Sequence, residues 1–330
     1  MGDKKFIEFA GGHGASFFFP VGSFADWKKG LEFYRAVAAS AKLKKALLKL
    51  AFPVLKRRAR LSSAEVAKVV ASELGLTELP SIDGHASAMI SPTRDKALVH
   101  HHGRSFEKFA SGGSLPGVRR ELELYRRLAE WGARSFAFSR ILDSSVGKSS
   151  VRFEMVYASG EFSDAPPKLS ELIEPLAEFF ALPGRTTRPW AELWNELAPG
   201  LELPAGYRDG ETPVGLVHRD FKPWNVKSGE KPLFFDFESA SFTGCPLEDL
   251  FNYIVEPMLQ SGRAENVSSV VRGKYRGAAE TLLDKLGIPR KEAERYWHWY
   301  LLERAAFWRT ENRARHAELF IRIYENDRMA

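Results

Sequence analysis

The chain has 330 residues, of which 44% are hydrophobic and 27% are charged, the proportions of a folded globular protein with room for two domains or one bilobal enzyme. Lysine and arginine outnumber aspartate and glutamate by 48 − 42 = 6, an excess too mild for a dedicated nucleic-acid-binding protein. The single cysteine, Cys245, excludes an internal disulfide, and the sequence has no uncharged apolar run of about 18 residues. We therefore expect no membrane span and a cytoplasmic location.

Residues 1–78 are predicted to form an N-terminal extension that is mostly helical. Short apolar runs at 6–9 and 16–20 predict two strands, and the apolar spacing from Asp26 to about Lys49 predicts a helix. The polar side of this region is strongly basic, with Lys42, Lys44, Lys45, Lys49, Lys56, Arg57, Arg58 and Arg60. A basic amphipathic helix either lies on an anionic membrane surface or packs its apolar side on the protein body. The first alternative would make the chain peripheral to the inner face of a membrane.

A capping box, Ser62-x-x-Glu65, predicts the start of a further helix that ends at Gly75. Residues 79–157 then read as a small β-rich region with strands near 86–90, 97–101 and 105–110. The third strand carries Lys108, and a helix with an apolar face from 118 to 131 carries Glu121 and Glu123. Two further runs, 140–143 and 151–157, predict a hairpin around a Ser/Gly turn.

The most informative stretch lies between residues 214 and 238. Apolar runs at 214–217 and 232–235 predict two strands of a β-hairpin that presents Asp220, Asn225 and Asp236 at one mouth. Mg²⁺ prefers oxygen ligands, which Asp236 and the side-chain carbonyl of Asn225 supply. Phosphoryl transfer needs such a metal and a carboxylate that orients the attacking hydroxyl, and Asp220 suits that second role. The pattern therefore predicts phosphoryl transfer.

The pattern H-x-D-x-x-x-x-N, followed by a strand and Asp-Phe-Glu, resembles the aminoglycoside phosphotransferase and choline kinase family of the protein-kinase-like fold. The resemblance implies an α+β, bilobal protein with a small antiparallel β-rich N-lobe (79–157) and a helical C-lobe (158–330). It also implies residue roles. Asp220, Lys222 and His218 form the catalytic group, with His218 bracing the loop, and Asn225 and Asp236 bind metal. Lys108, oriented by Glu121 or by the fallback Glu123, holds the nucleotide phosphates, and Met155 and Tyr157 lie at the hinge that meets adenine.

The residues that follow this stretch favour the small-molecule branch of the fold over the protein kinases. No Ala-Pro-Glu follows, and the segment between Glu238 and Asp249 is too short to bind a peptide. Asp249, on the next predicted helix, is expected to brace the catalytic loop, which is the segment after His218 that carries Asp220 and Asn225. A protein kinase and a non-catalytic binding protein of kinase fold remain the alternatives, although the intact set of functional side chains argues against the latter.

The C-terminal third predicts helices at 264–286 and 291–325. Residues 246–330 balance their charges, and the aromatic residues at helical spacing suit a buried core or sugar stacking. We therefore expect ATP- and Mg²⁺-dependent transfer of the γ-phosphoryl to a hydroxyl of a small molecule, a neutral or anionic sugar or saccharide rather than choline or an aminoglycoside.

Overall fold

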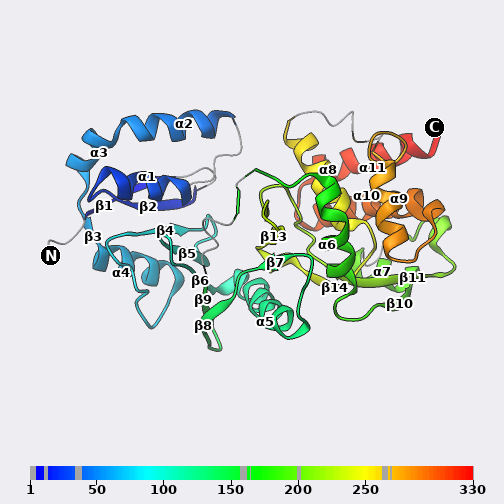
Figure 1. Cartoon of the computed structure of the whole chain (residues 1–330), viewed down its shortest axis with the longest axis horizontal. Coiled ribbons are helices and arrows are strands. Elements are labelled where there is room, and N and C mark those ends of the chain that lie inside the picture. The colour runs from blue at the N-terminus through cyan, green and yellow to red at the C-terminus, as the bar shows by residue number, and fades with distance from the viewer. Residues whose placement is uncertain are drawn as a thin grey trace. The chain divides into compact units, whose positions relative to one another are not determined.

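The computed structural model describes residues 5–10, 14–33, 39–156, 162–163, 165–198, 202–261, 267 and 270–329 (Figure 1). The chain divides into two compact units. Unit 1 comprises Met1–Arg126 and Ser139–Ser159, and unit 2 comprises Arg127–Phe138 and Gly160–Ala330. Helix α5 (Leu115–Trp131) begins in unit 1 and ends in unit 2. Within the described ranges, no helix combines the length and the apolar character needed to cross a membrane.

Unit 1 is organised around an antiparallel sheet of eight strands in the order β3-β1-β2-β4-β5-β6-β9-β8 (Figure 1). The strands are β1 (Lys5–Ala10), β2 (Ser16–Pro20), β3 (Leu61–Ser62), β4 (Ala86–Ile90), β5 (Lys96–His101), β6 (Ser105–Ser111), β8 (Ile141–Val146) and β9 (Ser150–Val156). The strands predicted between residues 86 and 157 are confirmed. The two strands predicted inside the N-terminal extension join the same sheet, because β2 pairs with β4.

Four helices cover this sheet. They are α1 (Phe24–Phe33), α2 (Ala39–Leu50), α3 (Phe52–Arg58) and α4 (Ser63–Leu74). The capping box that starts α4 is confirmed, since Ser62 Oγ accepts from the Glu65 N–H at 3.3 Å and the Glu65 carboxylate accepts from the Ser62 N–H at 2.6 Å. Gly75 ends the helix with φ 62°, a left-handed conformation that favours glycine. The single helix expected from Asp26 to Lys49 is two helices, with residues 34–38 outside the described ranges.

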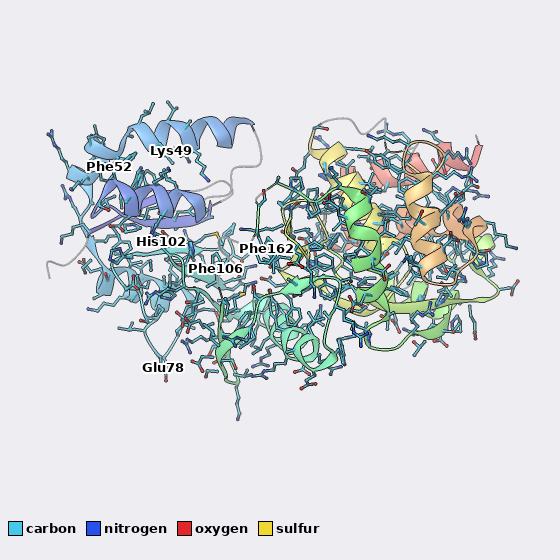
Figure 2. All side chains as sticks on the ribbon, viewed as in Figure 1. Lys49, Phe52, Glu78, His102, Phe106 and Phe162 are labelled. Carbon is cyan, nitrogen blue, oxygen red and sulfur yellow. The ribbon has the colours of Figure 1, made fainter. Side chains whose placement is uncertain are left out.

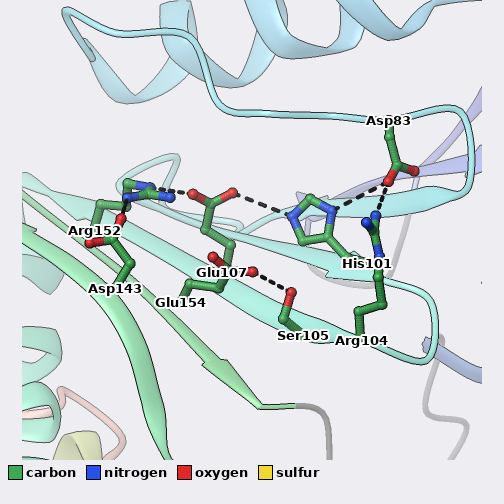
Figure 3. Close-up of polar contacts among 8 residues, drawn as sticks. All are labelled: Asp83, His101, Arg104, Ser105, Glu107, Asp143, Arg152 and Glu154. Atoms are coloured by element: carbon green, nitrogen blue, oxygen red, sulfur yellow. Dashed lines mark hydrogen bonds and ion pairs between the residues drawn. The ribbon is translucent and has the colours of Figure 1, made fainter.

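A chain of ionisable side chains ties neighbouring strands of unit 1 together (Figure 3). The Glu107 carboxylate is buried, pairs with the Arg152 guanidinium and lies 3.5 Å from Nε2 of His101. The His101 Nδ1 atom lies 4.0 Å from the Asp83 carboxylate. These contacts link β6, which carries Lys108, to its two neighbours β5 and β9. These contacts make His101 part of a polar network of the sheet.

Unit 2 is mainly helical. Its helices are α6 (Leu169–Ala181), α7 (Trp190–Leu197), α8 (Glu248–Gln260), α9 (Arg276–Lys285), α10 (Ala293–Thr310) and α11 (Ala314–Met329). The α+β class, with antiparallel strands first and helices later, is confirmed. Most of the aromatic side chains predicted on the C-terminal helices form the core, since Trp297, Trp299 and Tyr300 are at most 1% exposed, whereas Phe307 is exposed. The helix expected over 291–325 is interrupted, and Asn312 between α10 and α11 has φ 56°.

The predicted pairing of residues 214–217 with 232–235 is wrong. Strand β11 (Glu211–Val217) lies between β10 (Thr186–Pro189) and β14 (Ser241–Gly244). Strand β13 (Leu233–Phe234) instead pairs with β12 (Val226–Lys227) and, in parallel, with β7 (Ala137–Phe138). A Cβ atom on Gly244 would lie 1.9 Å from a methyl carbon of Val217, so glycine is what allows β14 to reach β11. Apolar runs identify strands without identifying their partners, which is why the pairing was missed.

Candidate active site

His218 follows the last residue of β11 and lies in the core of unit 2, where its side chain is fully buried. The ring N–H at Nε2 donates to the carbonyl oxygen of Phe235 at 2.9 Å. The backbone N–H groups of His218 and Arg219 donate to the two carboxylate oxygens of Asp249 at 2.7 and 2.9 Å. Asp249 lies in the first turn of α8. The predicted contact of Asp249 with the loop is therefore confirmed, and the bond from His218 to Phe235 agrees with the bracing expected of His218.

Arg219 has φ 62°, a left-handed backbone conformation that is costly for a residue with a side chain. Its carbonyl oxygen accepts from Asn252 Nδ2 at 3.0 Å, and Asn252 Oδ1 in turn accepts from the Tyr300 hydroxyl at 3.1 Å. Neither of these two side chains was predicted. Asn252 follows Asp249 by three residues on the same helix face, a spacing that could have indicated its role. Together these contacts hold the strained backbone next to Asp220.

The side chain of Asp220 is held from two sides. Asn225 Nδ2 donates to Asp220 Oδ2 and to the Asp220 carbonyl oxygen, both at 2.9 Å. Lys222 Nζ lies 2.5 Å from Asp220 Oδ1. The Asp220 side chain keeps 35% exposure, so a carboxylate of fixed orientation remains accessible to a substrate. The structure thus brings together three of the residues predicted from the sequence.

Asp236 lies two residues after the end of β13 and has a φ angle of 70°. It directly precedes a short 3-10 helix, Phe237–Ser239. The Phe235 N–H donates to the carbonyl oxygen of Asn225 at 3.3 Å, so Asn225 and Asp236 lie at the same end of the β12–β13 hairpin. Because the Asn225 amide nitrogen donates to Asp220, its side-chain oxygen points away from that carboxylate. An amide oxygen and a half-buried carboxylate are hard oxygen donors, and this donor set fits Mg²⁺.

The predicted lysine–glutamate pair is present in unit 1. Lys108 Nζ, on β6, lies 2.6 Å from Glu121 Oε2, on α5, and the two side chains are 4% and 1% exposed. Glu121 is therefore the partner of Lys108, whereas Glu123 is exposed. Met155 is buried in β9, and Tyr157 lies outside the described residues.

A cavity of about 90 Å³ in unit 2 adjoins the catalytic loop. Its lining comprises Leu193, Glu196, Leu197, Arg219, Thr243, Gly244, Cys245, Glu248, Trp299 and Glu303. The Arg219 guanidinium lies 3.4 Å from a carboxylate oxygen of Glu248 and 3.4 Å from one of Glu303. Burial, reinforced by the neighbouring Glu303 carboxylate, raises the pKa of Glu248 well above its usual range. The sequence analysis did not identify this group, because its two glutamates lie on different helices.

Replacing Asp249 by alanine should weaken both the fold and the catalytic loop. Burial raises the pKa of Asp249 to about 6, against the two N–H donors that favour its ionised form, so the carboxylate is mostly ionised at neutral pH. The variant leaves two N–H groups without their acceptor. We expect the free energy of unfolding to fall by about 3 kcal/mol, since each buried unpaired N–H costs roughly 1 to 3 kcal/mol. Urea denaturation measures this, with the exposed Asp209→Ala as the control; equal stability of the two variants would contradict the bracing role.

Part of the chain is similar to a known protein family, and most of it is similar to solved structures at low sequence identity. Residues 166–286 match the model of the phosphotransferase enzyme family. Among curated proteins, none matches the chain. A thermostable mutant of aminoglycoside phosphotransferase APH(4)-Ia, solved with ADP and hygromycin B, is 15% identical with a TM-score of 0.41, over 79% of this chain and 98% of that one.

Two further solved structures are similar at the same level of identity. The streptomycin-ATP complex of APH(2")-IIa is 13% identical with a TM-score of 0.41, over 82% of this chain and 97% of that one. The WbdD structure is 16% identical with a TM-score of 0.30, over 64% of this chain and 48% of that one. The segment matched by the family model contains Asp220, Asn225, Asp236 and Asp249. This segment of the chain is therefore similar to the phosphotransferase enzyme family.

Proposed function

We propose that the chain is an ATP- and Mg²⁺-dependent phosphotransferase that moves the γ-phosphoryl group to a hydroxyl of a small molecule. The observation that carries this proposal is the Asp220 carboxylate, fixed by Asn225 and Lys222 on a loop that Asp249 braces. A carboxylate that is oriented and partly exposed is what a hydroxyl nucleophile requires, because phosphoryl transfer depends on positioning more than on covalent chemistry.

Each side chain has a role in this scheme. Asp220 orients the acceptor hydroxyl and accepts its proton as the oxygen–phosphorus bond forms, and the nucleoside diphosphate leaves. Lys222, 2.5 Å from Asp220, carries a cation that suits the γ-phosphate. Lys108, oriented by Glu121, holds the α- and β-phosphates. Asn225 and Asp236 would hold Mg²⁺, which neutralises charge on the phosphates when bound. Met155 and Tyr157 are proposed for the adenine site.

The cavity beside Arg219 supports a hydroxylated acceptor. The carboxyl groups of its lining can accept hydrogen bonds from sugar hydroxyls. A cavity of about 90 Å³ has room for several water molecules, so part of a sugar can enter it. The Glu303 carboxylate balances the Arg219 guanidinium, and the raised pKa of Glu248 favours its uncharged form, so the lining carries no excess charge that would attract an ionic group. We therefore propose a neutral sugar or saccharide acceptor.

The organisation and location of the enzyme are also proposed from the sequence. The proposed regions are an extension (1–78), a nucleotide-binding lobe (79–157) and a catalytic and acceptor-binding lobe (158–330). The chain would act in the cytoplasm without binding nucleic acid.

The test is a nucleotide-consumption assay of the purified chain against neutral sugars, sugar acids, choline, kanamycin and protein substrates, with ATP and with GTP. Mg²⁺-dependent consumption of ATP with a neutral sugar, abolished by EDTA and restored by added Mg²⁺, is expected. Consumption only with protein substrates would identify a protein kinase. Tight nucleotide binding without transfer to any acceptor would identify a binding protein.

Replacing Glu121 by glutamine should raise the KM for the nucleotide about tenfold, since it removes a charged hydrogen bond that orients Lys108, worth about 1.5 kcal/mol. The variant also replaces the charged partner of the buried Lys108 ammonium by a neutral one, so the free energy of unfolding should fall by about 3 kcal/mol. Steady-state kinetics and urea denaturation measure the two effects. Glu123→Gln, two positions along the same helix and exposed, is the matched control; an equal KM in both variants would show that Lys108 does not hold the nucleotide.

A further inference from the structure

Helices α2 and α3 carry an apolar inner face that is already used. Leu48, Phe52 and Leu55 pack against a core cluster of unit 1 that contains Trp27. The Trp27 indole N–H donates to the Leu48 carbonyl oxygen at 3.1 Å, which fixes the side of α2 that faces inward. Figure 2 labels Lys49 and Phe52, which mark the two helices. Of the two alternatives for this basic segment, the structure shows the one in which its apolar side packs on the protein body. This packing does not account for the apolar side chains on the outer face of the two helices.

The two helices continue each other across Ala51. The Ala51 N–H donates to the Leu47 carbonyl oxygen at 3.0 Å, and the Leu55 N–H donates to the Ala51 carbonyl oxygen at 3.0 Å. Leu47, Leu50 and Val54 therefore follow the i, i+3, i+7 spacing of one helix face. This face points to solvent, because the three side chains are 57%, 79% and 58% exposed. We call these three residues the outer stripe.

The outer stripe is unusual for this chain. Large exposed apolar side chains in the described ranges are Phe24, Leu47, Leu50, Val54, Leu79, Leu142, Val146 and Phe307. Four of these eight lie on α1 to α3, and Leu50 is the most exposed of all. A continuous apolar stripe on a solvent-facing helix indicates an interaction surface, whereas scattered single residues do not.

The charge around the outer stripe has one sign. Lys44, Lys49, Lys56, Arg57 and Arg58 are exposed on α2 and α3, and Arg60 is exposed just after the end of α3. The sequence has no aspartate or glutamate from residue 39 to residue 64. A cationic rim around an apolar stripe is complementary to the head groups and acyl chains of an anionic lipid surface. The same rim repels a second copy of itself, so it disfavours self-association through this face.

We propose that α2 and α3 dock on an anionic membrane surface, with the outer stripe inserted at the boundary between head groups and acyl chains. Lys49, Arg57 and Arg58 contact lipid phosphates. The inner face keeps the helices attached to unit 1 while the outer face binds lipid. The same segment thus packs on the protein through one face and binds the membrane through the other. In this proposal, membrane binding requires insertion of the apolar side chains as well as attraction of the basic side chains to lipid phosphates.

Vesicle sedimentation with the full chain tests the insertion. Binding is measured on vesicles of phosphatidylglycerol with phosphatidylcholine and on vesicles of phosphatidylcholine alone. The triple variant Leu47→Ser, Leu50→Ser and Val54→Ser should bind the anionic vesicles at least about tenfold more weakly, since each buried CH₂ contributes to partitioning. Leu142→Ser with Val146→Ser, which removes two apolar side chains of β8 that are 49% and 53% exposed, is the control and should bind as the parent does.

The charge contribution is tested separately. Lys49→Gln, Arg57→Gln and Arg58→Gln should each weaken binding about fivefold, and added salt should weaken the parent more than the combined variant. Lys68→Gln, on the exposed side of α4, is the matched control. Thermal unfolding of every variant checks that unit 1 remains folded.

Three outcomes would overturn the proposal. The first is no sedimentation of the parent chain with anionic vesicles at low salt. The second is undiminished binding by the serine variant, which would reduce the interaction to charge alone. The third is concentration-dependent self-association in sedimentation velocity that the serine variant abolishes, because the outer stripe would then be a protein interface.

Discussion

Replacing Asp220 by asparagine is expected to lower kcat by at least about 10²-fold, the smaller end of the range for loss of a general base. Asparagine keeps the shape of the side chain, and its amide oxygen can still accept from Asn225 Nδ2, which now donates to Asp220 Oδ2 at 2.9 Å. The fold should therefore be retained. What is lost is the negative charge that accepts the hydroxyl proton and pairs with Lys222.

Steady-state kinetics with the best acceptor of the panel measures this effect, and calorimetry measures nucleotide affinity, which should barely change. Glu230→Gln is the matched control, because it neutralises an exposed carboxylate in the turn between β12 and β13. Turnover of Asp220→Asn close to that of the control would remove Asp220 from the proposed chemistry.

Replacing Asp236 by alanine is expected to abolish turnover and to weaken the binding of Mg²⁺-nucleotide at least about 100-fold, since even outer partners of metal ligands contribute roughly 10- to 100-fold. The side-chain oxygen of Asn225 alone supplies no charge to offset the cation. The left-handed backbone at Asp236 also costs an alanine about 1 kcal/mol. Asp236→Asn should separate the two effects, because asparagine tolerates this conformation and removes the carboxylate charge.

Titration calorimetry with ATP in the presence of Mg²⁺ and of EDTA measures the result. Both variants should lose the increment in affinity that Mg²⁺ gives the parent protein, whereas Glu230→Gln should keep it. If Asp236→Asn kept the full Mg²⁺ increment, the metal ligand would have to be sought elsewhere in the chain.

The pairing of Lys108 with Glu121 shows how far sequence patterns can lead. The lysine follows from a strand pattern and the glutamate from the helix after it, and only thirteen positions separate them. The family resemblance predicted the contact, and the short loop between the two elements agrees with it because short loops place consecutive elements side by side. The apolar spacing alone could not choose between Glu121 and Glu123. In the structure Lys108 pairs with Glu121, whose side chain is buried beside it.

The sequence by itself determined most strands of unit 1 and the contacts within the loop that carries Asp220, because both depend on residues that are close along the chain. The capping box at Ser62 and the group of Asp220, Lys222 and Asn225 are of this kind. Tertiary structure alone decided the partners of β11, since an apolar run carries no information about which strand it will meet.

Tertiary structure also decided the convergence of Glu248 and Glu303 on Arg219, which requires α8 and α10 to pack on the catalytic loop. It likewise decided which side of α2 and α3 faces solvent. Their segment has apolar residues on two faces, and only the contact with Trp27 determines which of them is buried. Periodicity gives the spacing of a face, but the free energy of burial depends on the surface that the rest of the fold presents to it.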